Sequence, residues 1–149
     1  MKDDPGFGLV AAVMATADAF LRESQRLFRP HGLTGAQYNV LNLLADRPAG
    51  ISQRELSDLL VVDRSNVTGL LDRLEKLGWV RRADHPEDRR IYQVSLTPAG
   101  RRLWEKVNPR YAEVVAQVTQ GIPVRQMKEC RETLRVLETA AAQWALPKK

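Results

Sequence analysis

The sequence has 149 residues, of which 44% are hydrophobic and 28% charged, and its net charge of +5 favours an anionic partner. No apolar run approaches the roughly 20 residues that span a bilayer, the acidic Asp3 and Asp4 are unlike the start of a secretory signal, and one cysteine excludes a disulfide framework. We therefore expect a globular cytoplasmic protein of one domain or two small lobes.

Two helices are predicted before residue 47. Residues 8–28 repeat apolar side chains at three- and four-residue steps, which indicates an amphipathic helix, and Pro30 and Gly32 end it. Thr34 and Gln37 then form a capping box, in which each side chain satisfies a backbone N–H of the other residue. This pattern predicts that a second helix begins at the capping box.

A helix-turn-helix is predicted next. A second capping box, from Ser52 to Glu55, opens a short helix, and Asp63 is the expected N-cap of a third helix over residues 64–77. Gly78 ends this helix, because glycine readily adopts the left-handed conformation of a C-cap. Two short helices joined by a tight turn are typical of a helix-turn-helix.

A hairpin and two further helices complete the predicted order. Residues 79–82 and 91–96 are β-type runs on either side of a polar loop, and a hairpin in this position is called a wing. Thr97 and Pro98 suit the N-cap and first position of another helix, and a last helix carries an apolar stripe that includes Cys130. The predicted fold class is mainly α with a small β-hairpin wing: a winged helix-turn-helix plus a helical dimerisation region.

The helix over residues 64–77 has the features of a helix that reads the major groove. At about 100° per residue, one side should face the core, and it carries Val67, Leu70, Leu71, Leu74 and Leu77. The other side is short and polar, as close approach to base edges requires. The candidate DNA-binding residues are Arg64, Ser65, Asn66, Thr68, Gly69 and Arg73. Inside a helix Gly69 costs about 1 kcal/mol relative to alanine, which close approach to DNA would explain. The alternative is an ordinary amphipathic helix with a solvated face.

The wing supplies a second set of candidates. Asp88, Arg89 and Arg90 lie at the predicted hairpin tip, and an arginine held there suits the negative potential of a narrow minor groove. A solvated charged turn is the alternative, but the position directly after a helix-turn-helix favours DNA. Arg81 and Arg82 lie in the preceding strand, where contact with DNA and simple exposure to solvent are equal alternatives.

Residues 33–103 resemble the MarR (multiple antibiotic resistance regulator) family in residues 33–38, 63–75, 78, 88–90 and 95–100. The resemblance implies a triangular homodimer whose winged lobes read a pseudo-palindromic operator. It implies that residues 1–32 and 98–149 form the dimerisation region and residues 33–97 the DNA-binding domain. The family's Asp-x-Arg wing motif falls on Asp88 and Arg90, which makes Arg90 the minor-groove candidate, Arg89 a phosphate candidate and Asp63 a partner that orients Arg90.

A dimer is also favoured by the terminal helices themselves. Their apolar stripes are broad, and one small winged lobe cannot cover them. A two-fold dimer would also double the contacts of one half-site across a helical turn of DNA.

The sequence gives only weak signals for an effector pocket, a metal or catalytic site, or a reactive cysteine. The resemblance implies a small aromatic or phenolic effector, with Tyr38, Trp104 and Tyr111 as candidate pocket residues, although aromatic residues at helical spacing are usually core. Both histidines are predicted in loops, without converging ligands, so we expect no metal, no cofactor and no enzyme. Cys130 is expected to be a packed, inert thiol rather than a peroxide sensor.

The sequence therefore predicts a sequence-specific double-stranded DNA-binding transcription regulator, a homodimeric repressor that a small-molecule ligand releases from DNA. The alternative is a winged-helix module that binds proteins and has no DNA affinity. The salt dependence of DNA affinity separates the two, because phosphate contacts release counterions and make the affinity fall steeply as the salt concentration rises.

Overall fold

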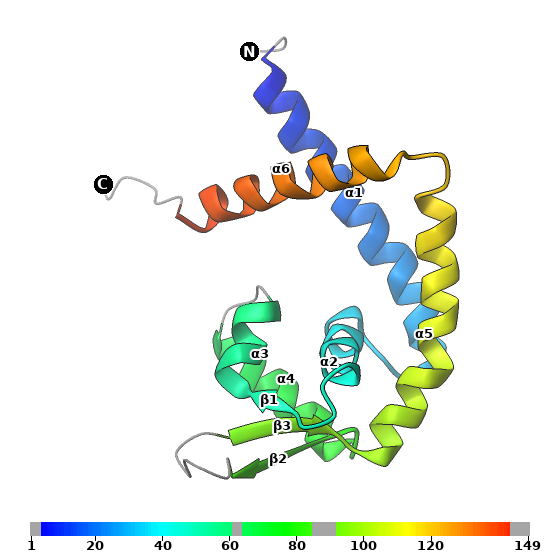
Figure 1. The fold of residues 1–149 in the computed structure, drawn as a ribbon, viewed down its shortest axis with the longest axis vertical. Helices are drawn as coiled ribbons and strands as arrows, with labels where there is room; N and C mark the ends of the chain where they lie inside the picture. The colour runs from blue at the N-terminus through cyan, green and yellow to red at the C-terminus, as the bar shows by residue number, and fades with distance from the viewer. Residues whose placement is uncertain (1–3, 61–63, 85–91, 144–149) are drawn as a thin grey trace. The chain divides into compact units, whose positions relative to one another are not determined.

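The computed structural model describes residues 4–60, 64–84 and 92–143. Its elements are α1 (Pro5–Phe28), the short 3-10 helix η1 (Arg29–His31), α2 (Gly35–Ala45), β1 (Ile51–Ser52), α3 (Gln53–Leu60), α4 (Arg64–Lys76), β2 (Val80–Asp84), β3 (Tyr92–Leu96), α5 (Pro98–Val118) and α6 (Val124–Gln143) (Figure 1). The chain divides into two compact units, Met1–Glu113 and Val114–Lys149. The predicted class, mainly helical with a small β wing, is confirmed.

The predicted start of α2 is confirmed by its capping contacts. At α2, the Thr34 N–H donates to Gln37 Oε1 at 2.8 Å and the Gln37 N–H donates to Thr34 Oγ1 at 3.2 Å, so both halves of the capping box form. The first helix begins earlier than predicted, because the carboxylate of Asp4 accepts the Gly6 N–H at 2.7 Å. Local side-chain capping thus sets where these helices begin.

The sheet differs from the predicted two-stranded hairpin. It has three antiparallel strands in the order β1-β3-β2, in which Ile51 pairs with Val94 and Val80 pairs with Leu96. Because β1 has two residues, it carries no readable alternation in the sequence. Gly50 precedes it with φ of 81°, and a Cβ there would lie 2.5 Å from the Val94 carbonyl oxygen. The glycine therefore lets the segment before β1 approach β3.

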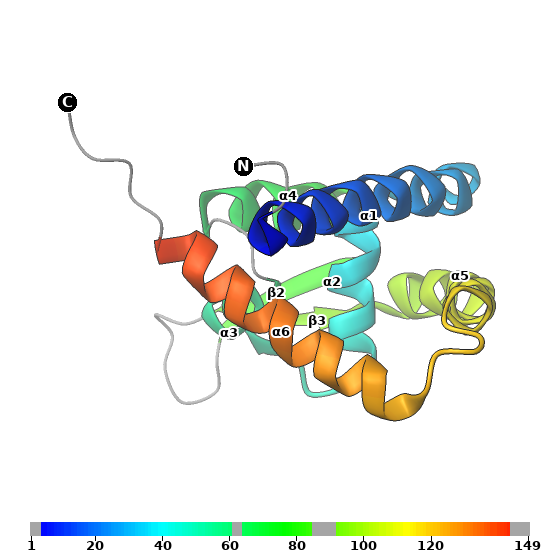
Figure 2. The same cartoon turned by 90° about the horizontal axis from the view of Figure 1, so that it is seen from above.

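The core of the first unit lies where α2, α3 and α4 pack on the sheet. α2 and β3 lie side by side in both views (Figures 1 and 2). Among the predicted core residues of α4, the fully buried ones are Val67, Leu71 and Leu74. Leu77 was predicted to face this core, which is wrong: it is 49% exposed. The helix ends at Lys76, so Leu77 lies in the turn that leads to Gly78 and leaves the buried face.

The second unit contains the last residues of α5 and all of α6. No residue of α6 is buried in the single chain. The prediction that Cys130 is packed is therefore wrong for the chain alone, since this thiol is exposed. Within the described residues, no helix is both long enough and apolar enough to cross a lipid bilayer.

Candidate nucleic-acid interface

The α4 helix presents the predicted polar face to solvent. Asn66, Thr68 and Arg73 are exposed, while Val67 and Leu71 on the opposite side are fully buried. Arg64 and Ser65 lie on the first turn of the same helix. All candidate residues predicted for this helix thus lie on α4. Its N-terminal half carries the short polar groups that reading of the major groove requires.

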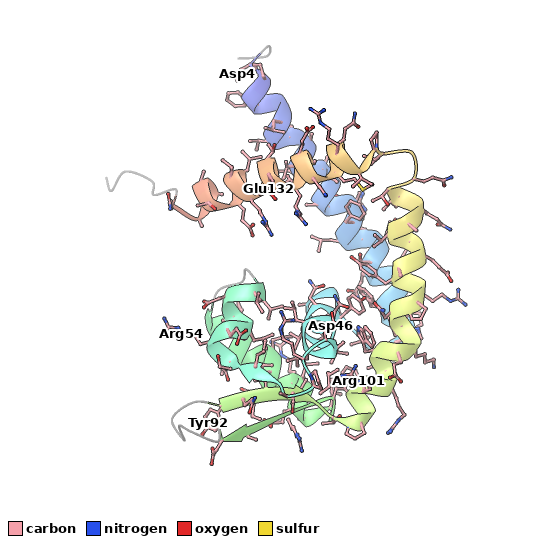
Figure 3. All side chains as sticks on the ribbon, in the orientation of Figure 1. Asp4, Asp46, Arg54, Tyr92, Arg101 and Glu132 are labelled. Atoms are coloured by element: carbon pink, nitrogen blue, oxygen red, sulfur yellow. The ribbon has the colours of Figure 1, made fainter. Side chains whose placement is uncertain are left out.

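A hydrogen bond joins this face to the preceding helix. Gln53, the first residue of α3, donates from Nε2 to Thr68 Oγ1 at 3.1 Å. With its oxygen accepting this bond, the Thr68 hydroxyl can still donate its proton to a base edge or a phosphate. Arg54, the next residue, is exposed and projects outward from α3 (Figure 3). Sequence reasoning used Gln53 only within a capping box and missed its contact with α4.

Gly69 is not required by crowding within α4. A Cβ at this position would find its nearest neighbour, Arg73 Nη2, at an ordinary distance of 3.8 Å. Arg73 itself donates from Nε to the Gly69 carbonyl oxygen at 3.1 Å, which folds the guanidinium along the helix surface. Packing among the described residues therefore gives no reason for glycine here.

Arg82 of β2 is engaged by two carboxylates of α4. Its guanidinium pairs with Asp72 and lies 3.0 Å from Glu75 Oε2. Hydrogen bonding to Asp72 raises the pKa of Arg82 above its usual value, burial opposes this, and Glu75 raises it further. The neighbouring Arg81 donates from Nε to Ser95 Oγ at 3.1 Å. Both arginines thus have partners within the protein, and the expectation of an ordinary solvated strand does not describe Arg82.

The described part of the wing ends at one pair of residues. Asp84 of β2 pairs with Tyr92 of β3, and Tyr92 is 54% exposed (Figure 3). The wing candidates Asp88, Arg89 and Arg90, and the predicted N-cap Asp63, lie outside the described residues. Their predicted DNA contacts stay predictions.

Two of the three candidate pocket residues form an aromatic cluster. Tyr38 is 1% exposed and stacks on Phe28 with ring centroids 4.5 Å apart, and Tyr111 lies 4.8 Å from Tyr38. The Tyr38 hydroxyl donates to Asn108 Oδ1 at 2.8 Å. Burial, with a further contribution from Tyr111, raises the pKa of Tyr38 to about 12, so its phenol remains a donor at neutral pH.

The third candidate, Trp104, makes different contacts. Its indole N–H donates to Asn42 Oδ1 at 3.1 Å, and the Arg101 guanidinium lies 5.8 Å from its ring centroid. Among residues 4–60, 64–84 and 92–143, no three His, Cys, Asp or Glu side chains form a group that could hold a metal ion.

Comparison with known sequences relates the chain to one family of regulators. A model of the MarR family matches residues 31–91. The HTH-type transcriptional regulator TtmR of Methylorubrum extorquens is 40% identical over 111 residues, which cover 72% of this chain and 56% of TtmR. The chain thus spans little more than half the length of this curated relative.

Comparison with solved structures extends the likeness along the chain. CouR of Rhodococcus jostii RHA1, solved bound to p-coumaroyl-CoA, is 31% identical with a TM-score of 0.77, over 92% of this chain and 93% of CouR. The M. tuberculosis transcriptional regulator MOSR, solved in complex with DNA, is 26% identical with a TM-score of 0.75, over 92% of this chain and 98% of MOSR. The likeness therefore includes the terminal helices as well as the winged lobe.

Proposed function

Because this chain belongs to the MarR family, we propose that it is a sequence-specific transcription regulator that binds double-stranded DNA as a homodimer. The observation that carries the proposal is the exposed polar face of α4, backed by fully buried Val67, Leu71 and Leu74 and followed directly by the strands of a wing. The proposal assigns the protein no catalytic role.

In this proposal α4 enters the major groove and the wing reaches the minor groove. Arg64, Ser65, Asn66, Thr68, Gly69 and Arg73 would supply base and phosphate contacts, and Asp88, Arg89 and Arg90 the wing contacts. The complex of MOSR with DNA supports this assignment, since MOSR shares the fold over nearly all of its length.

The terminal helices would form the dimer. In α1, Phe7, Met14 and Leu21 are 62%, 67% and 69% exposed, and in α6, Val136 is 69% exposed. Apolar side chains exposed to this extent along whole helices are typical of a surface that another copy covers. We therefore propose residues 1–32 and 98–149 as the dimerisation region and residues 33–97 as the DNA-binding domain.

A small aromatic or phenolic effector would release the protein from DNA. CouR, which was solved with an aromatic thioester, supports this class of effector. Tyr38, Trp104 and Tyr111 remain the proposed lining. Because Tyr38 is already covered by Phe28 and Tyr111, an effector would reach its ring only by displacing one of them.

The DNA-binding proposal is tested by selecting bound duplexes from a random pool and measuring affinity at several salt concentrations. We expect log K to fall linearly with log salt, with a slope of about −0.9 for each phosphate contacted. Arg73→Ala should reduce the slope, whereas Arg125→Ala, a matched loss of one charge on α6, should not. A chain that selects no duplex even at low salt would leave the protein-binding module as the better reading.

A further inference from the structure

Within the described residues, Arg82 of β2 links the wing to α4 through both its backbone and its side chain. We infer that Arg82 is a positioning residue that locks the wing strand β2 to α4, so that wing and recognition helix meet DNA in one fixed relative geometry. The inference rests on the proposed function, because it concerns how the proposed DNA surface is held together.

The lock consists of several hydrogen bonds from one residue. The Arg82 backbone N–H donates to Glu75 Oε1 at 3.0 Å, and its Nε donates to Glu75 Oε2, also at 3.0 Å. Its Nη2 pairs with Asp72 Oδ1. Asp72 and Glu75 are three residues apart and therefore lie on the same face of α4. Backbone and guanidinium are thus both bound to one helix, which opposes twisting of β2 as well as sliding.

The position of β2 in the sheet explains why such a link matters. β2 is an edge strand that pairs with β3 on one side. On its other side the Arg82 N–H donates a hydrogen bond to a side chain of α4. Without the contacts to Glu75 and Asp72, β2 would depend on its pairing with β3 for its orientation relative to α4. The Arg82 side chain is 19% exposed, so partial shielding from water strengthens these charge-assisted bonds. Arg81, in contrast, bonds within the sheet to Ser95 of β3.

Charge alone does not account for Asp72 and Glu75. Both are carboxylates on the helix that is proposed to enter the major groove, where negative charge opposes binding to phosphates. Simple electrostatics therefore predicts that removing Glu75 would strengthen DNA binding. The lock predicts the opposite, because a released wing loses its minor-groove contacts. This difference in sign makes the inference testable.

The first experiment compares Glu75→Ala and Arg82→Ala with wild type on a selected duplex. We expect binding about tenfold weaker, with wing protection lost in hydroxyl-radical footprints of the minor groove while dimethyl sulfate protection of guanine N7 in the major groove persists. Arg82→Lys should fail to restore wing protection, because an ammonium cannot reproduce the planar fork. The matched control is Glu129→Ala, which removes a carboxylate paired with an arginine on α6. Once sedimentation has shown that this variant is still a dimer, it should leave both footprints intact. Glu75→Ala binding as tightly as wild type with full wing protection would overturn the inference.

The second experiment needs no DNA. In the free protein, amide hydrogen exchange at Arg82 should become about tenfold faster in Glu75→Ala, while the same amide in Glu129→Ala exchanges at the wild-type rate. Unchanged exchange at Arg82 would show that Glu75 does not hold the strand and would overturn the lock itself. A wild-type chain that binds no duplex but shows the faster exchange in Glu75→Ala would instead sink the proposed function and leave the lock standing.

Discussion

Gly100, in the first turn of α5, lies directly against the carbonyl oxygen of Trp79. A Cβ at position 100 would come 2.0 Å from that oxygen and 2.8 Å from the carbonyl carbon. The same joint is held by Thr97, whose Oγ1 donates to the Gly78 carbonyl oxygen at 2.6 Å and accepts the Gly100 N–H at 3.0 Å. The start of α5 is therefore packed backbone to backbone on the turn that follows α4.

Gly100→Ala should destabilise the protein, because the added methyl group meets backbone that cannot rotate away. We expect the free energy of unfolding, measured by chemical denaturation, to fall by about 1–3 kcal/mol. Gly8→Ala is the matched control, since a Cβ built on this helical glycine meets no described atom within 4 Å apart from its chain neighbours and the backbone of its own helix. Equal stability of Gly100→Ala and wild type would mean that α5 can shift to make room.

Gly69→Ala should raise stability and weaken DNA binding. Alanine in a helix interior is favoured over glycine by about 1 kcal/mol, and the new Cβ would lie at an ordinary contact distance of 3.8 Å from Arg73 Nη2. If DNA approaches the helix backbone at this position, the same methyl group blocks it. Melting curves and titrations with a selected duplex give the two quantities. Full affinity in a stabilised variant would show that DNA does not approach Gly69 closely.

The helix and the wing should divide the recognition of DNA between them. Arg90→Ala is expected to weaken binding to selected and scrambled duplexes alike, by about 1–3 kcal/mol, because a guanidinium in the minor groove reads little sequence. Asn66→Ala and Thr68→Ala should instead reduce the preference for the selected duplex. Thr68→Ala also removes the hydroxyl that accepts the hydrogen bond from Gln53 Nε2.

The stability of these variants is the control. None should unfold the protein, whereas Leu71→Ala, in a fully buried position, should cost about 2–5 kcal/mol. Arg90→Ala with wild-type affinity would make the wing tip a solvated turn. Retained sequence preference in both Asn66→Ala and Thr68→Ala would mean that another face of α4 reads the bases.

Because of Tyr38, the free energy of unfolding should fall as the pH rises through the alkaline range. Its pKa is about 12 in the folded chain and 10.0 when unperturbed, so the folded state favours the protonated phenol. The corresponding stability is fully present below pH 10.0 and is lost as the pH rises towards 12. Tyr38→Phe should therefore lose less stability than wild type across this interval. Denaturation at several pH values measures the difference, and parallel curves for the two proteins would contradict it.

The dimer can be tested without DNA. Sedimentation at micromolar concentration should give twice the chain mass of 16.8 kDa, because the exposed apolar side chains of α1 and α6 need a partner. Met14→Glu, which places a charge at a 67% exposed position of α1, should shift the protein towards monomer without lowering its helix content. A monomeric wild type that still binds a palindrome tightly would exclude the dimer.

Local signals in the sequence were sufficient for the order of the helices and of the two wing strands, although not for β1. The Thr34–Gln37 capping box and the left-handed Gly78 act over a few residues, so their partners can be read directly from the chain. The polar face of α4 followed from helical periodicity in the same way. Where that periodicity was extended past the end of the helix, at Leu77, the prediction of burial was wrong.

Contacts between distant residues were decided by the tertiary structure. The sequence places Tyr38 and Asn108 seventy residues apart, and only packing brings the phenol within 2.8 Å of the amide. Arg82 could equally have been a solvated cation, until the fold set β2 beside the acidic face of α4. The pairing of β1 with β3 was equally unreadable, since a strand of two residues has no period of its own. Caps and turns are chosen by neighbours along the chain, whereas the partner of a buried or charged side chain depends on which elements pack together.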